Sequence, residues 1–184
     1  MQRRQFITAT AVAATSPTLT FAASESSATI PAPFVVKGRE SRFAEKTKLF
    51  GTSPNDIKVS AKDTGNMLSV LEYNGREKGG PPLHIHPSQD EIFYVMEGNY
   101  LFVVGAEQHK LTTGDLIFLP RNVPHTFAQL TDTGRMVFFL QPGGKMEDYF
   151  RKLGTLTAQP SPQEGAKLFT DHDMQVVGPP LTID

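Results

Sequence analysis

Short apolar runs separated by turn residues recur along most of this chain. Ile57, Val59 and Ala61 alternate with polar neighbours, which is the pattern of a half-buried strand. Further apolar runs follow at regular intervals, with glycine, proline or asparagine between many of them: 67–73, 83–86, 91–97, 100–104, 116–119, 126–130 and 136–140. Even spacing of this kind, with almost no helical period, predicts an antiparallel sandwich or barrel. The expected fold class is therefore all-β.

The segments that flank the predicted barrel, residues 46–143, differ from it in composition. A Ser/Ala/Pro-rich tether, 24–45, precedes it and includes a short candidate strand at 34–36. After the barrel, residues 146–153 place their apolar side chains on one face, as an amphipathic helix does. Ser161-Pro162 is a typical helix start, and a second short helix is expected to end near residue 169. Residues 144–184 are therefore predicted to form a helical and extended cap.

Residues 1–23 have the order of an export signal: paired arginines, a weakly apolar stretch, then small residues at Ala22 and Ala23. Arg3-Arg4-Gln5-Phe6-Ile7 resembles the core of a twin-arginine (Tat) signal. The alternative is a disordered or amphipathic leader. Export predicts a periplasmic or secreted protein. Cleavage would remove two of the 18 basic residues and none of the 19 acidic ones, which gives the mature protein a net charge of −3.

Composition excludes several classes of protein. The chain has no cysteine, which excludes disulfides, thiolate metal sites and cysteine nucleophiles. The near balance of 18 basic and 19 acidic residues argues against a nucleic-acid partner. No apolar run approaches the length of about 18 residues that a membrane span needs, so no membrane association is expected in the mature form. Any metal site must therefore use nitrogen and oxygen ligands.

Three of the five histidines lie close together in the sequence. His84 and His86 are two residues apart on a predicted strand, so both side chains point to the same face. Glu91 and His125 follow on later strands. Three imidazoles and one carboxylate suit a divalent transition metal ion: Fe, Mn, Ni, Co, Cu or Zn. The alternative is ordinary surface or core histidines, with Glu91 left unbound or hydrogen-bonded.

The spacing of these residues resembles the two motifs of the cupin superfamily. The first motif has His84, one residue, His86, four residues, Glu91, six residues and Gly98. The second has Gly114, five residues, Pro120, one residue, Asn122, two residues, His125, three residues and Gln129. Asn122 and Gln129 replace the glycine and asparagine of the family pattern. The resemblance covers 67–143 and implies that His84, His86, Glu91 and His125 bind one metal ion inside a double-stranded β-helix, a jelly-roll-like barrel. It also suggests a homodimer.

The stretch 79–98 further resembles single-domain bacterial cupins of the quercetin 2,3-dioxygenase type, which open the central ring of flavonols with O2 and release carbon monoxide. This resemblance implies a metal-dependent dioxygenase for a flavonol-like or other enolisable aromatic substrate, with Glu91 as proton acceptor as well as ligand. Two alternatives remain: an isomerase, epimerase or lyase that uses the metal as a Lewis acid, and a non-catalytic small-molecule-binding cupin.

Residues at even separations from Glu91 and His125 are expected on the interior face of the barrel. Interior side chains either fill the core or line a pocket for an aromatic ligand. The candidate pocket residues are Phe93, Val95, Phe102, Phe118, Phe127, Gln129 and Phe138. Ile92, Tyr94 and Met96 should face the opposite side, toward another sheet or a partner copy.

Four polar residues near these motifs have less specific expectations. Gln89 and Asp90 are neighbours on a turn, and either face solvent or support the ligands. His109 is expected to be exposed in a polar hairpin turn. His172 is expected in the tail, without an assigned role.

Overall fold

The computed structural model of the chain describes residues 32–45, 47–49 and 52–183. The predicted export signal over 1–23 lies outside these residues, as does the first part of the predicted tether.

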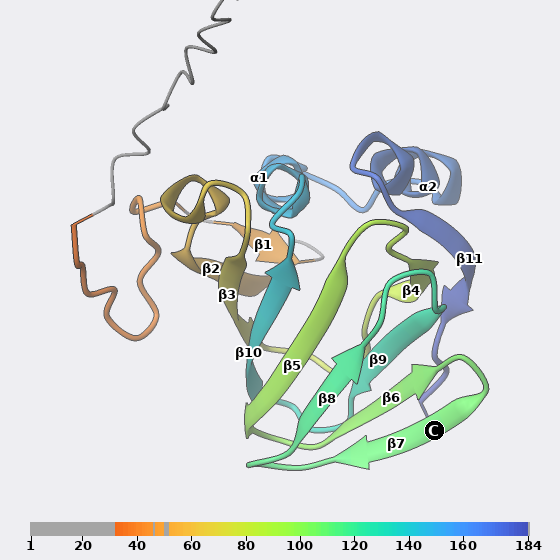
Figure 1. Cartoon of the computed structure of the whole chain (residues 1–184). Helices are drawn as coiled ribbons and strands as arrows, with labels where there is room; N and C mark the ends of the chain where they lie inside the picture. Colours follow the sequence, from red (N-terminus) through yellow and green to blue (C-terminus); the bar gives the residue numbers. More distant parts are fainter. Residues whose placement is uncertain (1–31, 46, 50–51, 184) are drawn as a thin grey trace, which may run out of the picture. The chain divides into compact units, whose positions relative to one another are not determined.

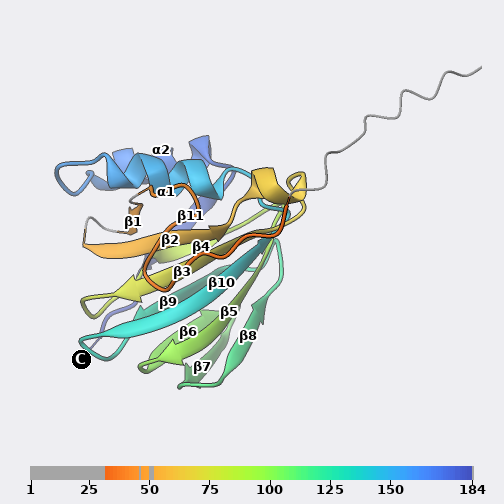
Figure 2. The same cartoon turned by 90° about the vertical axis from the view of Figure 1, so that its left-hand side faces the viewer.

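Two antiparallel sheets face each other and form a double-stranded β-helix (Figures 1 and 2). The six-stranded sheet has the order β1-β2-β3-β10-β5-β8, and the five-stranded sheet has the order β11-β4-β9-β6-β7. The strands are β1 (Lys48–Leu49), β2 (Ser53–Val59), β3 (Ser69–Gly75), β4 (Pro82–Ile85), β5 (Asp90–Glu97), β6 (Tyr100–Val104), β7 (Glu107–Leu111), β8 (Leu116–Leu119), β9 (His125–Gln129), β10 (Gly134–Gln141) and β11 (Gln175–Pro180). The all-β prediction is confirmed.

The core lies between the two sheets, and along β5 and β10 its buried positions alternate with more exposed ones. In β10, Met136, Phe138 and Leu140 are buried, and their neighbours are partly exposed. Phe138 lies opposite Leu71 of β3 on one side and Phe93 of β5 on the other. Burial of each such side chain contributes about 1.5–3 kcal/mol, so these central rows hold the sheets together.

Two helices cover one end of the barrel (Figures 1 and 2). They are α1 (Met146–Gly154) and α2 (Pro162–Asp171), close to the predicted ranges. Ser161 begins α2: its hydroxyl accepts a hydrogen bond from the Glu164 amide, and the Glu164 carboxylate accepts one from the Ser161 amide. In the part of the chain that the structure describes, neither helix has the length and apolar character needed to cross a membrane.

Three local predictions were wrong. Residues 34–36 form no strand: Val35 is 80% exposed, and the Arg42 guanidinium covers the Phe34 ring at 3.8 Å instead. Ala61 begins a short 3-10 helix rather than extending β2, because Ser60 caps that helix. The predicted turn around His109 is strand β7, an edge strand of polar residues that pairs only with β6 and so lacks apolar alternation.

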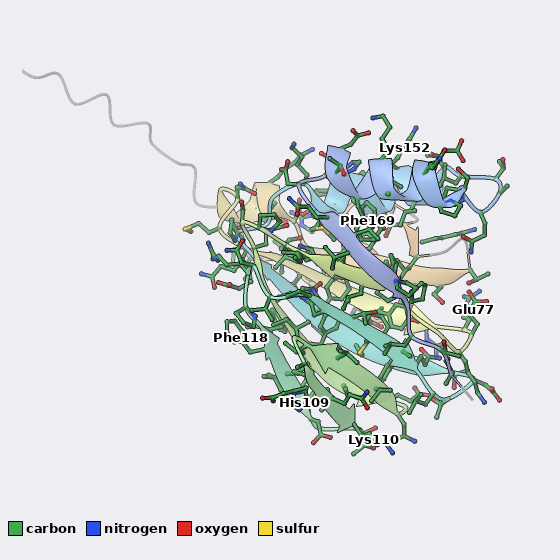
Figure 3. All side chains as sticks on the ribbon, turned by 90° about the vertical axis from the view of Figure 1, so that its right-hand side faces the viewer. Glu77, His109, Lys110, Phe118, Lys152 and Phe169 are labelled. Atoms are coloured by element: carbon green, nitrogen blue, oxygen red, sulfur yellow. The ribbon has the colours of Figure 1, made fainter. Side chains whose placement is uncertain are left out.

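The outer face of the six-stranded sheet carries exposed apolar side chains. Tyr94 and Met96 of β5 face away from the core, as predicted, and are 41% and 37% exposed. Phe118 of β8 lies beside Ile92 on this same face and is 54% exposed (Figure 3). Its assignment to the pocket was therefore wrong. A partner copy on this face stays a prediction.

Candidate metal centre

Four side chains converge at the end of the barrel nearest the helices. His84 of β4 is directly paired with His125 of β9, His86 follows β4, and Glu91 belongs to β5 in the other sheet. Their nitrogen and oxygen donor atoms all lie within 4.8 Å of one another. Each of the four residues is at most 7% exposed. The structure thus brings all four predicted ligands into one buried cluster.

Hydrogen bonds orient the three imidazoles. His84 and His125 each place Nδ1 against the carbonyl oxygen two residues earlier, at 2.8 and 3.0 Å. His86 places Nδ1 against Oε1 of the Gln89 side chain, at 3.3 Å. Since these oxygens only accept hydrogen bonds, each Nδ1 carries the proton. The Nε2 lone pairs are then free to bind a cation.

Two of these free nitrogens face the side-chain oxygen of Glu91 without a hydrogen bond to it. Nε2 of His125 lies 3.3 Å from Oε2 of Glu91, and Nε2 of His86 lies 3.9 Å from it. Both nitrogens are buried, and neither has a hydrogen-bond partner in the part of the chain that the structure describes. Buried lone pairs of two imidazoles beside a carboxyl oxygen, with no such partner for either nitrogen, form a site that a cation would complete. The residues present therefore fit a divalent metal ion bound through nitrogen and oxygen.

The environment also keeps two of the imidazoles neutral. Burial lowers the pKa of His84 well below its ordinary value of 6.5, and the neighbouring His125 and His86 lower it further. Burial is also the main cause that lowers the pKa of His86. At pH 7 both are ready to bind a metal without first losing a proton.

An apolar cavity of about 40 Å³ adjoins the cluster. It is lined by four of the predicted pocket residues: Phe93, Phe102, Phe127 and Phe138. Val95 is fully buried in the core and does not reach the cavity. Gln129 lies opposite Tyr100, four residues along β9 from His125, about 13 Å away at the usual rise of a strand. These two interior positions were correctly predicted to face inward but lie too far from the cluster.

Sequence reasoning missed the contribution of the helical cap. Tyr149 and Phe150 of α1 and Phe169 of α2 line the same cavity. The Phe169 ring lies edge-on to His84, with centroids 5.3 Å apart, and edge-on to Tyr149 at 5.2 Å. The signal was the apolar face of 146–153, since that face must pack against something.

Gln89 and Asp90 face opposite sides of the sheet. Gln89 is buried and contacts His86, whereas Asp90 faces outward and binds the Arg121 guanidinium. Hydrogen bonds from Arg121 lower the pKa of Asp90 to about 2.

The two remaining histidines lie outside the cluster. His109 is half exposed beside Glu107, on β7 rather than in a turn. His172 ends α2, where Nδ1 contacts the Leu168 carbonyl at 2.8 Å and the ring lies 5.6 Å from Tyr149. It belongs to the packed cap rather than to a free tail.

Comparisons with known proteins agree with this geometry. The family described as "Cupin domain" matches residues 71–142. A quercetin 2,3-dioxygenase of Bacillus subtilis (strain 168) is 24% identical over 95 residues, which are 52% of this chain and 28% of that protein. This chain spans only 28%, 34% and 52% of the lengths of the curated relatives that it matches.

Two solved structures share the fold at low identity. KdgF from Halomonas sp. superposes with a TM-score of 0.52 at 16% identity, covering 61% of this chain and 94% of that one. A predicted oxalate decarboxylase from Thermotoga maritima gives 0.51 at 14%, covering 60% and 99%. Residues 71–142 thus match the cupin domain family, and the two-sheet barrel and the motif spacing that supplies its buried donors agree with this match.

Proposed function

We propose that this protein is a metal-dependent dioxygenase that opens the ring of a flavonol-like or other enolisable aromatic substrate with O2. The observation that carries the proposal is a buried three-histidine, one-carboxylate cluster that adjoins a cavity walled by phenylalanines. The similarity to a quercetin 2,3-dioxygenase supports it over the matched segment.

In this proposal, His84, His86 and His125 hold a divalent ion through Nε2, and Glu91 is the fourth donor. A bound divalent ion would supply Lewis acidity that favours the enolate form of the substrate and brings it close to O2. Glu91 lines the cavity together with the imidazoles, and in this proposal its carboxylate accepts the enol proton. The phenylalanine rings exclude water and stack on an aromatic substrate.

The cap controls access to this site. A cavity of about 40 Å³ has room for a few water molecules, which is less than an aromatic ring system needs. The Phe169 side chain, which lies beneath α2 in Figure 3, and Tyr149 must therefore move when such a substrate binds. Phe169→Ala is expected to lower the KM for a bulky flavonol and to leave the metal content unchanged.

Aerobic incubation of each metal-loaded form with quercetin tests the reaction. We expect loss of flavonol absorbance, oxygen uptake and carbon monoxide release for at least one metal, and no activity in Glu91→Gln. The matched control is Asp90→Asn, which changes the neighbouring carboxylate on the outer face and should keep full activity. No oxygen uptake with any metal would contradict the proposal. Anaerobic turnover would support the isomerase, epimerase or lyase alternative, and thermal stabilisation without turnover would support a binding module.

An exported location is part of the proposal and rests on Arg3-Arg4 and the stretch that follows them. Replacing both arginines by lysine should retain the protein in the cytoplasm in a cell-fractionation experiment. Unchanged fractionation would contradict a Tat route.

A further inference from the structure

Gln89 lies between a candidate metal ligand and the loop that begins the cap. Its Oε1 contacts Nδ1 of His86 at 3.3 Å, and its Nε2 donates to the carbonyl oxygens of Pro142 and Gly143, both at 2.8 Å. The side chain is 4% exposed, so no water competes for these positions.

The two carbonyls determine which way the Gln89 amide points. Its NH2 group can only donate, and main-chain carbonyls can only accept. The reversed amide would place Oε1 against the oxygens of both Pro142 and Gly143. Oε1 therefore faces His86, and His86 must carry its proton on Nδ1, which leaves Nε2 toward Glu91.

His86 differs in this respect from the other two imidazoles. His84 and His125 donate Nδ1–H to main-chain oxygens of their own segments, so no substitution of a neighbouring side chain removes the acceptor. Of the three imidazoles in the cluster, His86 alone has a side chain as its Nδ1 partner. The orientation of this ligand can therefore be changed by substitution at a single other position.

The other end of Gln89 is packed tightly against the β10–α1 loop. Gly144 has φ +57°, and a Cβ added there would lie 2.5 Å from Gln89 Nε2. Lys145 and α1 follow directly, and Met146 and Tyr149 of this helix line the cavity. One side chain thus connects the cluster to the element that closes the cavity.

We propose that Gln89 is a positioning residue: it holds His86 with Nε2 toward the metal position and couples this ligand to the loop that begins the cap. The role does not depend on which reaction the centre performs. Loss of a hydrogen-bond partner that orients a metal-ligating histidine typically lowers metal affinity about 10–100-fold.

The test compares three variants of the full chain. Gln89→Met keeps the size of the side chain and removes both the acceptor and the donors. Gln89→Glu keeps an acceptor for His86 and loses the donors to the loop. Asn66→Gly is the matched control, because it removes the acceptor of the Gly144 amide, at 2.9 Å, without touching His86. Glycine also tolerates the positive φ of Asn66, +67°.

Two measurements separate the roles: long-range 1H–15N NMR spectra of the imidazoles in the metal-free protein, and Zn²⁺ affinity by competition with a chelator. We expect His86 to lose its Nδ1–H preference in Gln89→Met, while His84 and His125 keep theirs, and Zn²⁺ affinity to fall about 10–100-fold. Gln89→Glu should keep the tautomer and unfold at lower temperature. Asn66→Gly should keep both the tautomer and the affinity.

An unchanged His86 tautomer in Gln89→Met would overturn the proposal, as would an equal loss of Zn²⁺ affinity in Asn66→Gly. If Gln89→Met does not fold, Gln89→Glu tests the proposal instead, because it retains an acceptor for Nδ1 of His86. A His86 that carries its proton on Nε2 in that variant would overturn the proposal. The tautomer is measured without metal or substrate, so its outcome is independent of the proposed dioxygenase activity.

Discussion

The two faces of strand β5 carry neighbouring carboxylates in opposite environments. Glu91 points inward and is 5% exposed, and within residues 32–45, 47–49 and 52–183 its charged-group contacts are with imidazole nitrogens and not with a lysine or arginine. Asp90 points outward, where the Arg121 guanidinium binds both of its oxygens at 3.0 and 2.7 Å. The outer carboxylate therefore has a cation within the chain, whereas the inner one, among the described residues, belongs to a donor cluster that suits a bound metal ion. On β5, therefore, the face of the strand on which a carboxylate lies, rather than its residue type, separates an ion pair from a candidate metal ligand.

Removing one metal-donor side chain from the inner face should have the largest effect of these changes, and the quantity affected is divalent-metal affinity. His125→Ala is expected to lower divalent-metal affinity by more than about 100-fold, since loss of a hydrogen-bond partner alone costs about 10–100-fold. Competition with a chromophoric chelator measures it. His109→Ala, a half-exposed histidine of β7, is the control and should bind metal as the parent does. Equal affinity in both variants would contradict the assignment of the inner face.

Phe93 on the inner face and Tyr94 on the outer face of β5 should differ in how much they contribute to the free energy of unfolding. Phe93→Ala should lower the free energy of unfolding by about 3–5 kcal/mol, because the ring stacks on Phe138 at 5.1 Å in the core. Tyr94→Ala on the outer face should change it by about 0.5 kcal/mol or less. Urea denaturation measures both. A large effect at Tyr94 that depends on protein concentration would instead indicate a partner copy on that face.

Breaking the outer ion pair between Asp90 and Arg121 should have the smallest effect on the free energy of unfolding, and this effect should depend on pH. Arg121 lowers the pKa of Asp90 from 3.8 to about 2, so the pair stabilises the fold above pH 3.8 and this contribution is lost as pH falls toward 2. Asp90→Asn should therefore reduce the free energy of unfolding by at most about 1 kcal/mol at pH 7. Parent and variant should converge near pH 2 in urea titrations. If the difference in stability between parent and variant grew as pH falls, it would contradict this assignment.

Much of the fold follows from local pattern, and the exceptions have physical causes. His84 and His86 could be placed on one face because strand geometry alone determines it, and Asn122 takes the glycine position of the second motif at φ +64°. Phe118 was misplaced because no ligand or register on β8 showed which of its faces is inside.

The role of the cap could not be predicted, since it depends on contacts between distant segments. Glu147 of α1 accepts hydrogen bonds from the hydroxyls of Ser60 and Ser69, which are 87 and 78 positions away. No local pattern in 146–153 indicates these partners. Their effect is to hold the helix whose Tyr149 and Phe150 side chains line the cavity.

The inner-face cluster of His84, His86, Glu91 and His125 is predicted to bind one divalent metal ion. Anomalous diffraction from crystals of the protein loaded with Zn²⁺ or Co²⁺ tests it most directly. We predict a single strong peak about 2.0–2.1 Å from Nε2 of His84, His86 and His125, with a Glu91 oxygen as a further ligand. Absence of a peak at this position, or a metal bound elsewhere while these four side chains keep their metal-free arrangement, would contradict the account.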